Sequence, residues 1–137
     1  MYADEGVHIA FETGQETPET LLSVLEELER PAVGVNFDPA NLLLYGMGEP
    51  IAALRQLAPH VRQIHVKDAR RPRAPRQWGE EVPVGEGEVD WRAFFRIVAD
   101  HPIEGDLVIE REAGASRVAD IRRARETVRR ELPHAAG

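Results

Sequence analysis

Four short apolar segments recur along this chain, and each ends in a side chain that can bind a metal ion. The segments are residues 8–12, 33–38, 61–65 and 106–110, and their last residues are Glu12, Asp38, His65 and Glu110. Apolar residues at helical spacing separate the segments and follow the last one. Strands that alternate with helices of about 10–15 residues predict a parallel sheet with right-handed crossovers.

The predicted helices have recognisable starts. Thr17 is a good N-cap, and Pro18 occupies the first helical position, where its missing N–H breaks no helical hydrogen bond. Pro31 ends this helix, Pro50 opens the next one, and Asp90 is expected to cap a third. These signals set the helices between the predicted strands.

Three further expectations concern the connections and the last helix. A loop containing Gly46 and Gly48 follows the second strand, and a long irregular loop rich in Pro, Gly and Arg covers residues 69–88. The last helix is expected to place its large apolar residues on one side, and these are Val118, Ile121, Val128 and Leu132.

The alternation within each strand predicts where the ligand-type side chains point. Successive side chains of a strand point to opposite faces, so Glu12 lies opposite Ile9 and Phe11, and His65 lies opposite Ile64. A barrel has this pattern, because helices cover its outer face and the active site forms at the C-terminal strand ends. The predicted fold class is therefore α/β, of the (β/α) TIM-barrel type, with about four β/α units.

Composition excludes several classes of partner. The net charge of −7 argues against general nucleic-acid binding, and the lack of cysteine excludes disulfides and thiolate metal sites. No run of about 18 apolar residues is present, so no membrane span is expected. Residues 1–6 lack the basic and apolar segments of a signal peptide. We therefore expect a soluble, cytoplasmic protein that binds neither nucleic acid nor a membrane.

The four ligand-type residues predict one metal site. Three carboxylates and one imidazole suit Mn²⁺, Mg²⁺, Co²⁺ or Zn²⁺. A single glutamate at a strand end is usually solvated or caps a helix, and a single histidine in a strand is usually a hydrogen-bonded core residue. Four such residues at equivalent strand ends are harder to explain in this way.

Five motifs carry a resemblance to a known family. They are residues 11–16 (FETGQE), 36–42 (NFDPANL), 65–68 (HVKD), 83–91 (PVGEGEVDW) and 109–112 (IERE). Together they resemble the xylose isomerase-like TIM-barrel superfamily, and within it the sugar phosphate isomerase/epimerase group. The resemblance covers nearly the whole chain and aligns it with strands five to eight of the family barrel.

The resemblance implies roles for the matching residues. Glu12, Asp38, His65 and Glu110 match the family's metal ligands, with Mn²⁺ as the first choice of ion, and Glu12 and Glu110 also match its proton-transferring pair. The implied reaction is isomerisation or epimerisation of a sugar or sugar phosphate, in which the ion stabilises an enediolate and a carboxylate returns the proton. Dehydration of a keto-polyol, cleavage at abasic DNA sites and a non-catalytic half-barrel that acts as a binding or assembly module stay open as alternatives.

Four more residues are candidates for substrate binding. Asn41 stands where family epimerases commonly carry a histidine that touches substrate. Arg71 matches a substrate-binding arginine, although Arg70 competes for that role. Lys67 and Asp68 either orient the metal-binding histidine or form an ion pair at the strand end.

The remaining candidates are the arginines of the 69–88 loop and four aromatic residues. The arginines of the 69–88 loop either bind a phosphate or carboxylate or belong to a solvated loop. Trp78, in the same loop, is a candidate lid over the site. Trp91, Phe94 and Phe95 are expected to pack a helix against the core rather than stack on a sugar.

Length limits what this chain can form alone. A TIM barrel takes about 250 residues and eight strands, and this chain has 137 residues and four predicted strands. We interpret residues 1–137 as a single domain, the C-terminal half of a barrel. The two open sheet edges leave three explanations: a fragment or truncated frame, which we favour, a homodimer that closes one barrel, or an open α/β layer.

Overall fold

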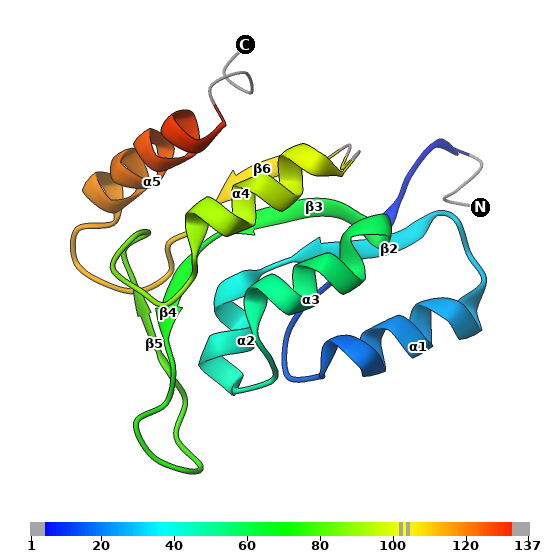
Figure 1. Cartoon of the computed structure of the whole chain (residues 1–137), viewed down its shortest axis with the longest axis horizontal. Helices are drawn as coiled ribbons and strands as arrows, with labels where there is room; N and C mark the ends of the chain where they lie inside the picture. The colour runs from blue at the N-terminus through cyan, green and yellow to red at the C-terminus, as the bar shows by residue number, and fades with distance from the viewer. Residues whose placement is uncertain (1–4, 102, 104, 133–137) are drawn as a thin grey trace.

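A four-stranded parallel sheet forms the centre of the molecule (Figure 1). A computed structural model describes residues 5–101, 103 and 105–132. The strands lie in the order β1-β2-β3-β6, and their bounds are Ile9–Glu12, Val33–Phe37, Val61–Val66 and Asp106–Ile109. All neighbouring strands of this sheet are parallel, as the alternation of strands and helices predicted.

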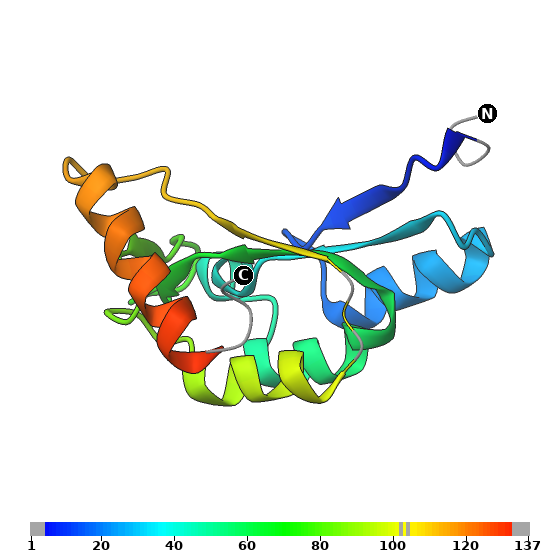
Figure 2. The same cartoon turned by 90° about the horizontal axis from the view of Figure 1, so that it is seen from above.

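Helices cover one face of the sheet. α1 (Pro18–Leu28), α3 (Pro50–Leu57) and α4 (Trp91–Asp100) all lie on the same side (Figure 2). The core between sheet and helices includes Phe37, Ile64, Leu54, Phe94 and Phe95, each at most 1% exposed. The fold class is therefore α/β, with about half of a TIM barrel present and the ligand-type residues on the face that the helices leave bare.

The helix starts follow the predicted signals. The Thr17 hydroxyl accepts a hydrogen bond from the Thr20 amide at 3.3 Å, and the Asp90 carboxylate accepts one from the Ala93 amide at 3.0 Å. Trp91 is buried with the phenylalanines of α4, so its predicted packing role is confirmed.

The expectation that helices cover the outer face of every strand is wrong for β1. Ile9 is 49% exposed and Phe11 is 41% exposed. A right-handed crossover carries each helix toward the next strand, so α1 lies beside α3, which it contacts, and no described helix covers the outer side of β1. This apolar edge belongs to an incompletely surrounded sheet.

A short helix, α2 (Pro39–Tyr45), follows β2 where only a loop was predicted. Asp38 caps it, and Pro39 occupies its first turn, the same pair of signals that opens α1. Gly46 ends the helix with φ 68°, a left-handed conformation that glycine adopts without strain. The predicted loop with Gly46 and Gly48 therefore begins only after α2 has ended at Tyr45.

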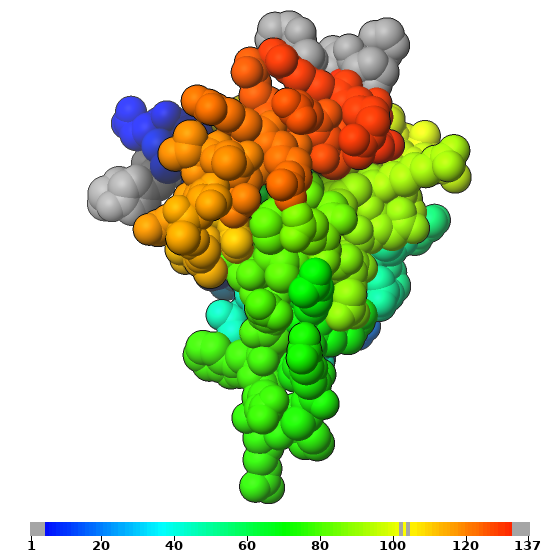
Figure 3. All heavy atoms as spheres, turned by 90° about the vertical axis from the view of Figure 1, so that its left-hand side faces the viewer, coloured from blue at the N-terminus to red at the C-terminus, as the bar shows by residue number. Residues whose placement is uncertain are grey.

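The stretch after β3 is also more regular than predicted. β4 (Asp68–Arg70) and β5 (Glu80–Val82) pair as an antiparallel hairpin that projects from the body of the molecule (Figure 3). At Gly79 a Cβ atom would lie 2.2 Å from the carbonyl oxygen of Arg70, so only glycine permits this close approach. Strands of three residues with few apolar side chains carry no period-2 pattern, which is why the hairpin was not predicted.

The last helix, α5 (Arg117–Glu131), turns a different side inward than expected. Val118 is 66% exposed and Ile121 is 40% exposed, whereas Ala124 is buried. The cause is electrostatic: Asp120 faces inward because its carboxylate accepts a hydrogen bond at 2.9 Å from the guanidinium of Arg111. The apolar pattern of α5 was therefore misread for Val118 and Ile121, while Val128 and Leu132 do pack against the core.

The helices also bear on membrane association. Among the described residues, no helix has both the length and the apolar character that crossing a bilayer requires.

Candidate metal centre

Four ligand-type side chains meet at the C-terminal ends of the parallel strands. Glu12 ends β1, Asp38 follows β2, His65 lies in β3, and Glu110 follows β6. One ligand atom from each residue lies within 4.8 Å of all the others. Parallel strands place these ends at one edge of the sheet, so residues up to 98 positions apart (12 to 110) come together.

The two carboxylate oxygens of Asp38 have different surroundings: one caps α2 and the other faces the cluster. Its Oδ1 accepts hydrogen bonds from the amides of Ala40 at 2.8 Å and Asn41 at 3.1 Å, which caps α2. Its Oδ2 is buried without a hydrogen-bond partner among the described residues. The backbone of Asp38 is fixed by Thr13, whose hydroxyl accepts from its N–H and donates to its C=O, both at 2.8 Å.

His65 points one ring nitrogen into the cluster. Its Nδ1 lies 3.2 Å from Glu12 Oε1, 3.5 Å from Glu110 Oε2 and 3.6 Å from Asp38 Oδ2. Interaction with Asp38 is the largest cause that raises the pKa of His65; burial opposes this shift, and Glu110 and Glu12 add to it. Its other nitrogen, Nε2, lies 3.0 Å from Nδ2 of Asn36.

These residues fit a divalent cation. Asp38 Oδ2 and His65 Nδ1 are both buried without hydrogen-bond partners within the described ranges, and buried polar atoms are normally satisfied. Burial raises the pKa of Glu12, and repulsion from Asp38 and Glu110 raises it further. A cation held by three carboxylates and one imidazole removes this repulsion and satisfies both buried atoms.

Lys67 occupies the edge of the cluster. Its ammonium donates to Glu110 at 2.8 Å and to Glu112, and it lies 3.8 Å from Asp38. Burial disfavours the charged form, yet the two glutamates and Asp38 outweigh this and raise the pKa of Lys67. It is the only lysine in the sequence. Of its two predicted roles, the structure favours the ion pair at the strand end.

Asp68 faces away from the cluster. Its carboxylate is buried and accepts hydrogen bonds from the amides of Gly85, Gly87 and Val89 and from the indole N–H of Trp91. It therefore fixes the loop before α4, a role that neither predicted alternative included.

A cavity of about 370 Å³ opens over the cluster. The residues that line it include Glu12, Asn41, Tyr45, Lys67, Glu110 and Glu112. Asn41 donates to Glu12 Oε1 at 3.1 Å and to the carbonyl of Thr13 at 3.0 Å, so it orients one carboxylate of the candidate metal centre from the wall of this cavity.

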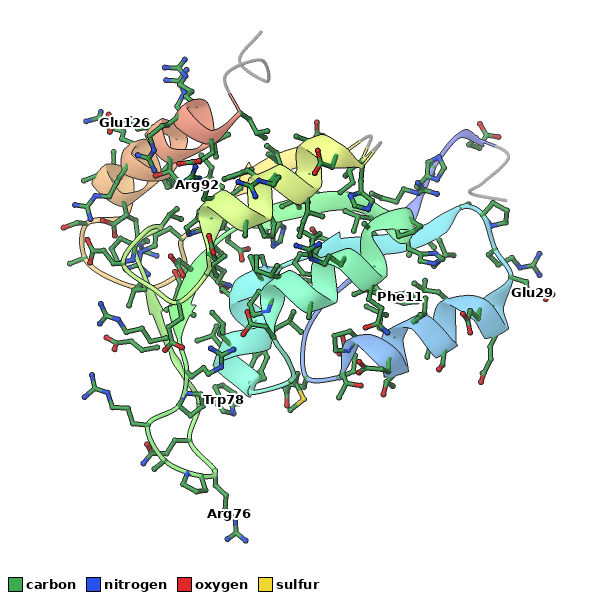
Figure 4. The ribbon with its side chains drawn as sticks, viewed as in Figure 1. Phe11, Glu29, Arg76, Trp78, Arg92 and Glu126 are labelled. Atoms are coloured by element: carbon green, nitrogen blue, oxygen red, sulfur yellow. The ribbon has the colours of Figure 1, made fainter. Side chains whose placement is uncertain are left out.

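The predicted arginines lie outside this cavity. The guanidinium of Arg71 pairs with Glu49 at 2.7 Å and Glu88 at 2.9 Å, and that of Arg70 donates to the carbonyl of Glu86. Figure 4 shows Arg76 at the tip of the β4–β5 hairpin, pointing away from the body of the molecule. The sequence interpretation of a solvated loop fits these residues better than an anion site.

The family model described as "Xylose isomerase-like TIM barrel" matches residues 1–131. The chain belongs to this family.

Individual relatives agree with that assignment. A xylose isomerase domain protein from Planctomyces limnophilus is 38% identical, with a TM-score of 0.84 over 96% of this chain and 48% of its own. A xylose isomerase-like TIM barrel protein from Mycobacterium smegmatis, solved in complex with magnesium, is 20% identical, with a TM-score of 0.81 over 98% and 47%. An inosose dehydratase from Clostridium botulinum (strain Alaska E43 / Type E3) is 25% identical over 85% of this chain and 44% of its own. The chain thus spans less than half the length of these relatives.

Three residues at or beside the candidate site were not identified as site residues from sequence. Asn36 contacts His65, Tyr45 lines the cavity, and Glu112 binds Lys67. Period-2 alternation could have found Asn36 and Glu112, since they lie two residues from Asp38 and Glu110 and share their faces. Tyr45 carried no such signal, because the helix that presents it was not predicted.

Proposed function

We propose that this chain carries the metal-binding half of a sugar or sugar phosphate isomerase or epimerase that depends on a divalent cation, with Mn²⁺ as the first choice. The observation that carries the proposal is the convergence of Glu12, Asp38, His65 and Glu110 within 4.8 Å. Three oxygen ligands and one imidazole form the donor set.

The proposed mechanism divides the four residues by position. All four residues would hold the ion, with Asp38 and His65 as the more buried pair. Glu12 and Glu110 can have a second role, because they come from opposite edge strands of the sheet and border the cavity. When bound, a divalent ion stabilises the negative charge that develops on the carbonyl and neighbouring hydroxyl oxygens of a substrate.

Glu12 and Glu110 are proposed as the proton carriers. Glu12 is proposed as the first base, because Asn41 fixes one of its oxygens and the carboxylate borders the cavity. One carboxylate takes a proton from the carbon beside the carbonyl. A proton is then given either to the former carbonyl carbon, while the hydroxyl proton moves to the former carbonyl oxygen, or by the other carboxylate, which is protonated, to the opposite face of the first carbon. The first outcome is isomerisation, and the second is epimerisation.

Dehydration of a keto-polyol is the second candidate. The inosose dehydratase from Clostridium botulinum is a 25% identical relative over 85% of this chain. Elimination of water begins with the same removal of a proton beside a carbonyl, so the residues proposed above serve both reactions. The products differ, because elimination leaves a new carbon–carbon double bond.

Further β/α units are proposed to complete the barrel along the open edges of β1 and β6. They come either from the rest of a longer chain or from a second copy of this one. Light scattering with and without Mn²⁺ separates these cases, because a dimer supports closure by a second copy and a monomer contradicts it. A non-catalytic half-barrel would bind metal without turnover. The proposed location is the cytoplasm.

Two measurements, metal binding first and proton exchange second, test the proposed function. Calorimetry should show saturable Mn²⁺ binding that Glu110→Gln weakens, while Glu27→Gln on the exposed side of α1 leaves it unchanged. Substrate sugars incubated in D₂O should gain deuterium beside the carbonyl, and product analysis then distinguishes isomer, epimer and dehydrated product. The proposal fails if no saturable binding is found or if Glu110→Gln does not alter it.

A further inference from the structure

Asn36 lies beside the metal centre without belonging to it. It is two residues before Asp38 on β2 and 8% exposed. Its backbone carbonyl accepts a hydrogen bond from the amide of Thr13 at 3.1 Å, and its strand pairs with β1 and β3 on either side. The backbone therefore holds the Asn36 side chain at a fixed place against His65.

The contact with His65 constrains which ring nitrogen carries hydrogen. Nδ1 faces the three carboxylates, so it must present its lone pair to bind an ion, and the hydrogen of the neutral ring is then on Nε2. When an ion is bound, the partner of Nε2 must therefore be an acceptor.

The carboxamide of Asn36 can meet this requirement by a half-turn. Its Nδ2 lies 3.0 Å from His65 Nε2, and its Oδ1 is buried without a partner in the part of the chain that the structure describes. A half-turn exchanges the two atoms and leaves the shape of the side chain unchanged. The oxygen then accepts the Nε2 hydrogen, and the ring is held with Nδ1 toward the ion.

We propose that Asn36 is a positioning residue whose Oδ1 accepts the hydrogen of His65 Nε2 and so directs Nδ1 into the metal centre. This inference rests on the proposed metal-dependent function. A carboxylate is a common partner for a metal-binding histidine, but this site already holds three. A neutral amide supplies the acceptor without a fourth negative charge.

Three variants separate this role from simple packing. Asn36→Leu removes both polar atoms at similar size, whereas Asn36→Asp keeps only acceptors. Gln63→Leu is the matched control, because Gln63 pairs with Asn36 in the sheet register and carries the same amide group on the neighbouring strand. Mn²⁺ affinity is measured by calorimetry for each variant and for the unaltered chain.

Loss of the acceptor should weaken Mn²⁺ binding by about 10- to 100-fold in Asn36→Leu. Asn36→Asp should bind Mn²⁺ at least as tightly as the unaltered chain. Gln63→Leu should change the affinity for Mn²⁺ by less than about threefold, which is well below the loss expected for Asn36→Leu. Equal weakening in the Leu and Asp variants would overturn the inference, since Asp keeps the acceptor.

Nuclear magnetic resonance of the unaltered chain tests the same contact without relying on a variant that folds. Long-range ¹H–¹⁵N spectra with saturating diamagnetic Mg²⁺ should show hydrogen on His65 Nε2. An Nε2 without hydrogen in the Mg²⁺-bound chain overturns the inference about Asn36 and leaves the proposed function standing. If the chain binds neither Mn²⁺ nor Mg²⁺, the proposed function fails and the inference fails with it.

Discussion

Asp38 Oδ2 and His65 Nδ1 lie 3.6 Å apart, and both are buried without hydrogen-bond partners among the described residues. Each is the one atom of its side chain that local structure does not use. The other oxygen of Asp38 caps α2, and the other nitrogen of His65 meets Asn36. The folded chain thus aims one oxygen and one nitrogen at a shared point. The capping role of Asp38 and its proposed metal-binding role use different oxygens, so mutation can separate them.

Substitution of Asp38 should separate metal binding from helix capping. Asparagine is as good an N-cap as aspartate, so Asp38→Asn should keep α2 while it removes the anionic ligand. Asp38→Ala should lose both, at a cost of about 1 kcal/mol in the free energy of unfolding of the metal-free chain. Urea unfolding measures the first quantity and calorimetry with Mn²⁺ the second.

Urea unfolding and Mn²⁺ calorimetry also show when the assignment of Asp38 is wrong. Wild-type Mn²⁺ affinity in Asp38→Asn would contradict the assignment of Oδ2 as a ligand. In the unaltered chain, Mn²⁺ at a free concentration of about 100 times the Kd should raise the free energy of unfolding by about 2.7 kcal/mol. EDTA should reverse this gain.

The His65 contribution to stability should depend on pH in the metal-free chain. Because its pKa is raised above 6.5, chiefly by Asp38, the folded state holds this proton more tightly than the unfolded chain. The stabilisation is fully present below pH 6.5 and is lost as the pH rises through the folded pKa. Thermal unfolding in EDTA across mildly acidic to mildly alkaline pH measures it.

Mn²⁺ should reverse this trend. The ion and the proton compete for Nδ1, so stabilisation by Mn²⁺ should grow with pH over the same range. His65→Asn removes the titrating ring and serves as the control, in which the histidine-dependent part of both trends should vanish. Stabilisation by Mn²⁺ that did not vary with pH would contradict coordination by His65.

Lys67→Met should weaken the metal-free fold and strengthen metal binding. The ammonium is buried and bonded to Glu110 and Glu112, and hydrogen bonds to charged groups contribute about 1.5–3 kcal/mol each. Since Glu112 is largely exposed, we expect a loss near the lower end of that range. Removal of a positive charge 3.8 Å from Asp38 should also raise the affinity for Mn²⁺.

Chemical denaturation and calorimetry on the same samples test both halves of this prediction. Lys67→Arg keeps the charge and is the control, so it should not gain affinity for Mn²⁺. A Met variant that bound Mn²⁺ more weakly than the unaltered chain would show that the ammonium supports the ion rather than opposing it.

Asp68→Ala should be strongly destabilising. It would leave the buried amide of Val89 and the indole N–H of Trp91 unsatisfied, together with two partly buried glycine amides. A buried group left without its partner costs about 1–3 kcal/mol, so we expect a total loss of at least about 3 kcal/mol. Tryptophan fluorescence during urea unfolding measures it.

Asp90→Ala is the matched control for this prediction. It removes only the cap of α4 and should cost about 1 kcal/mol. If Asp68 served only to bind substrate, its removal would leave the free energy of unfolding unchanged, and the structural role assigned here would be wrong.

Much of the fold could be predicted from short patterns because they act locally. Thr17-Pro18 marks a helix start wherever it occurs, and alternation in residues 8–12 fixes which side of a strand Glu12 shares. The same logic failed for α5, where the apolar residues Val118 and Ile121 predict one face and the tertiary partner of Asp120 selects another. This partly buried ion pair joins α5 to Arg111, which lies outside the helix, so the apolar spacing of the helix does not contain it.

The candidate site shows the same division. The sequence by itself determined the four ligand types and their strand ends, because side-chain chemistry and period-2 geometry depend only on neighbouring residues. Only the tertiary structure decided that Asp38 and His65 keep one unpartnered atom each, that Lys67 turns to the glutamates, and that Asp68 turns to the loop. Those choices depend on which groups the packed strands bring within hydrogen-bond distance, and spacing along the chain does not encode that distance.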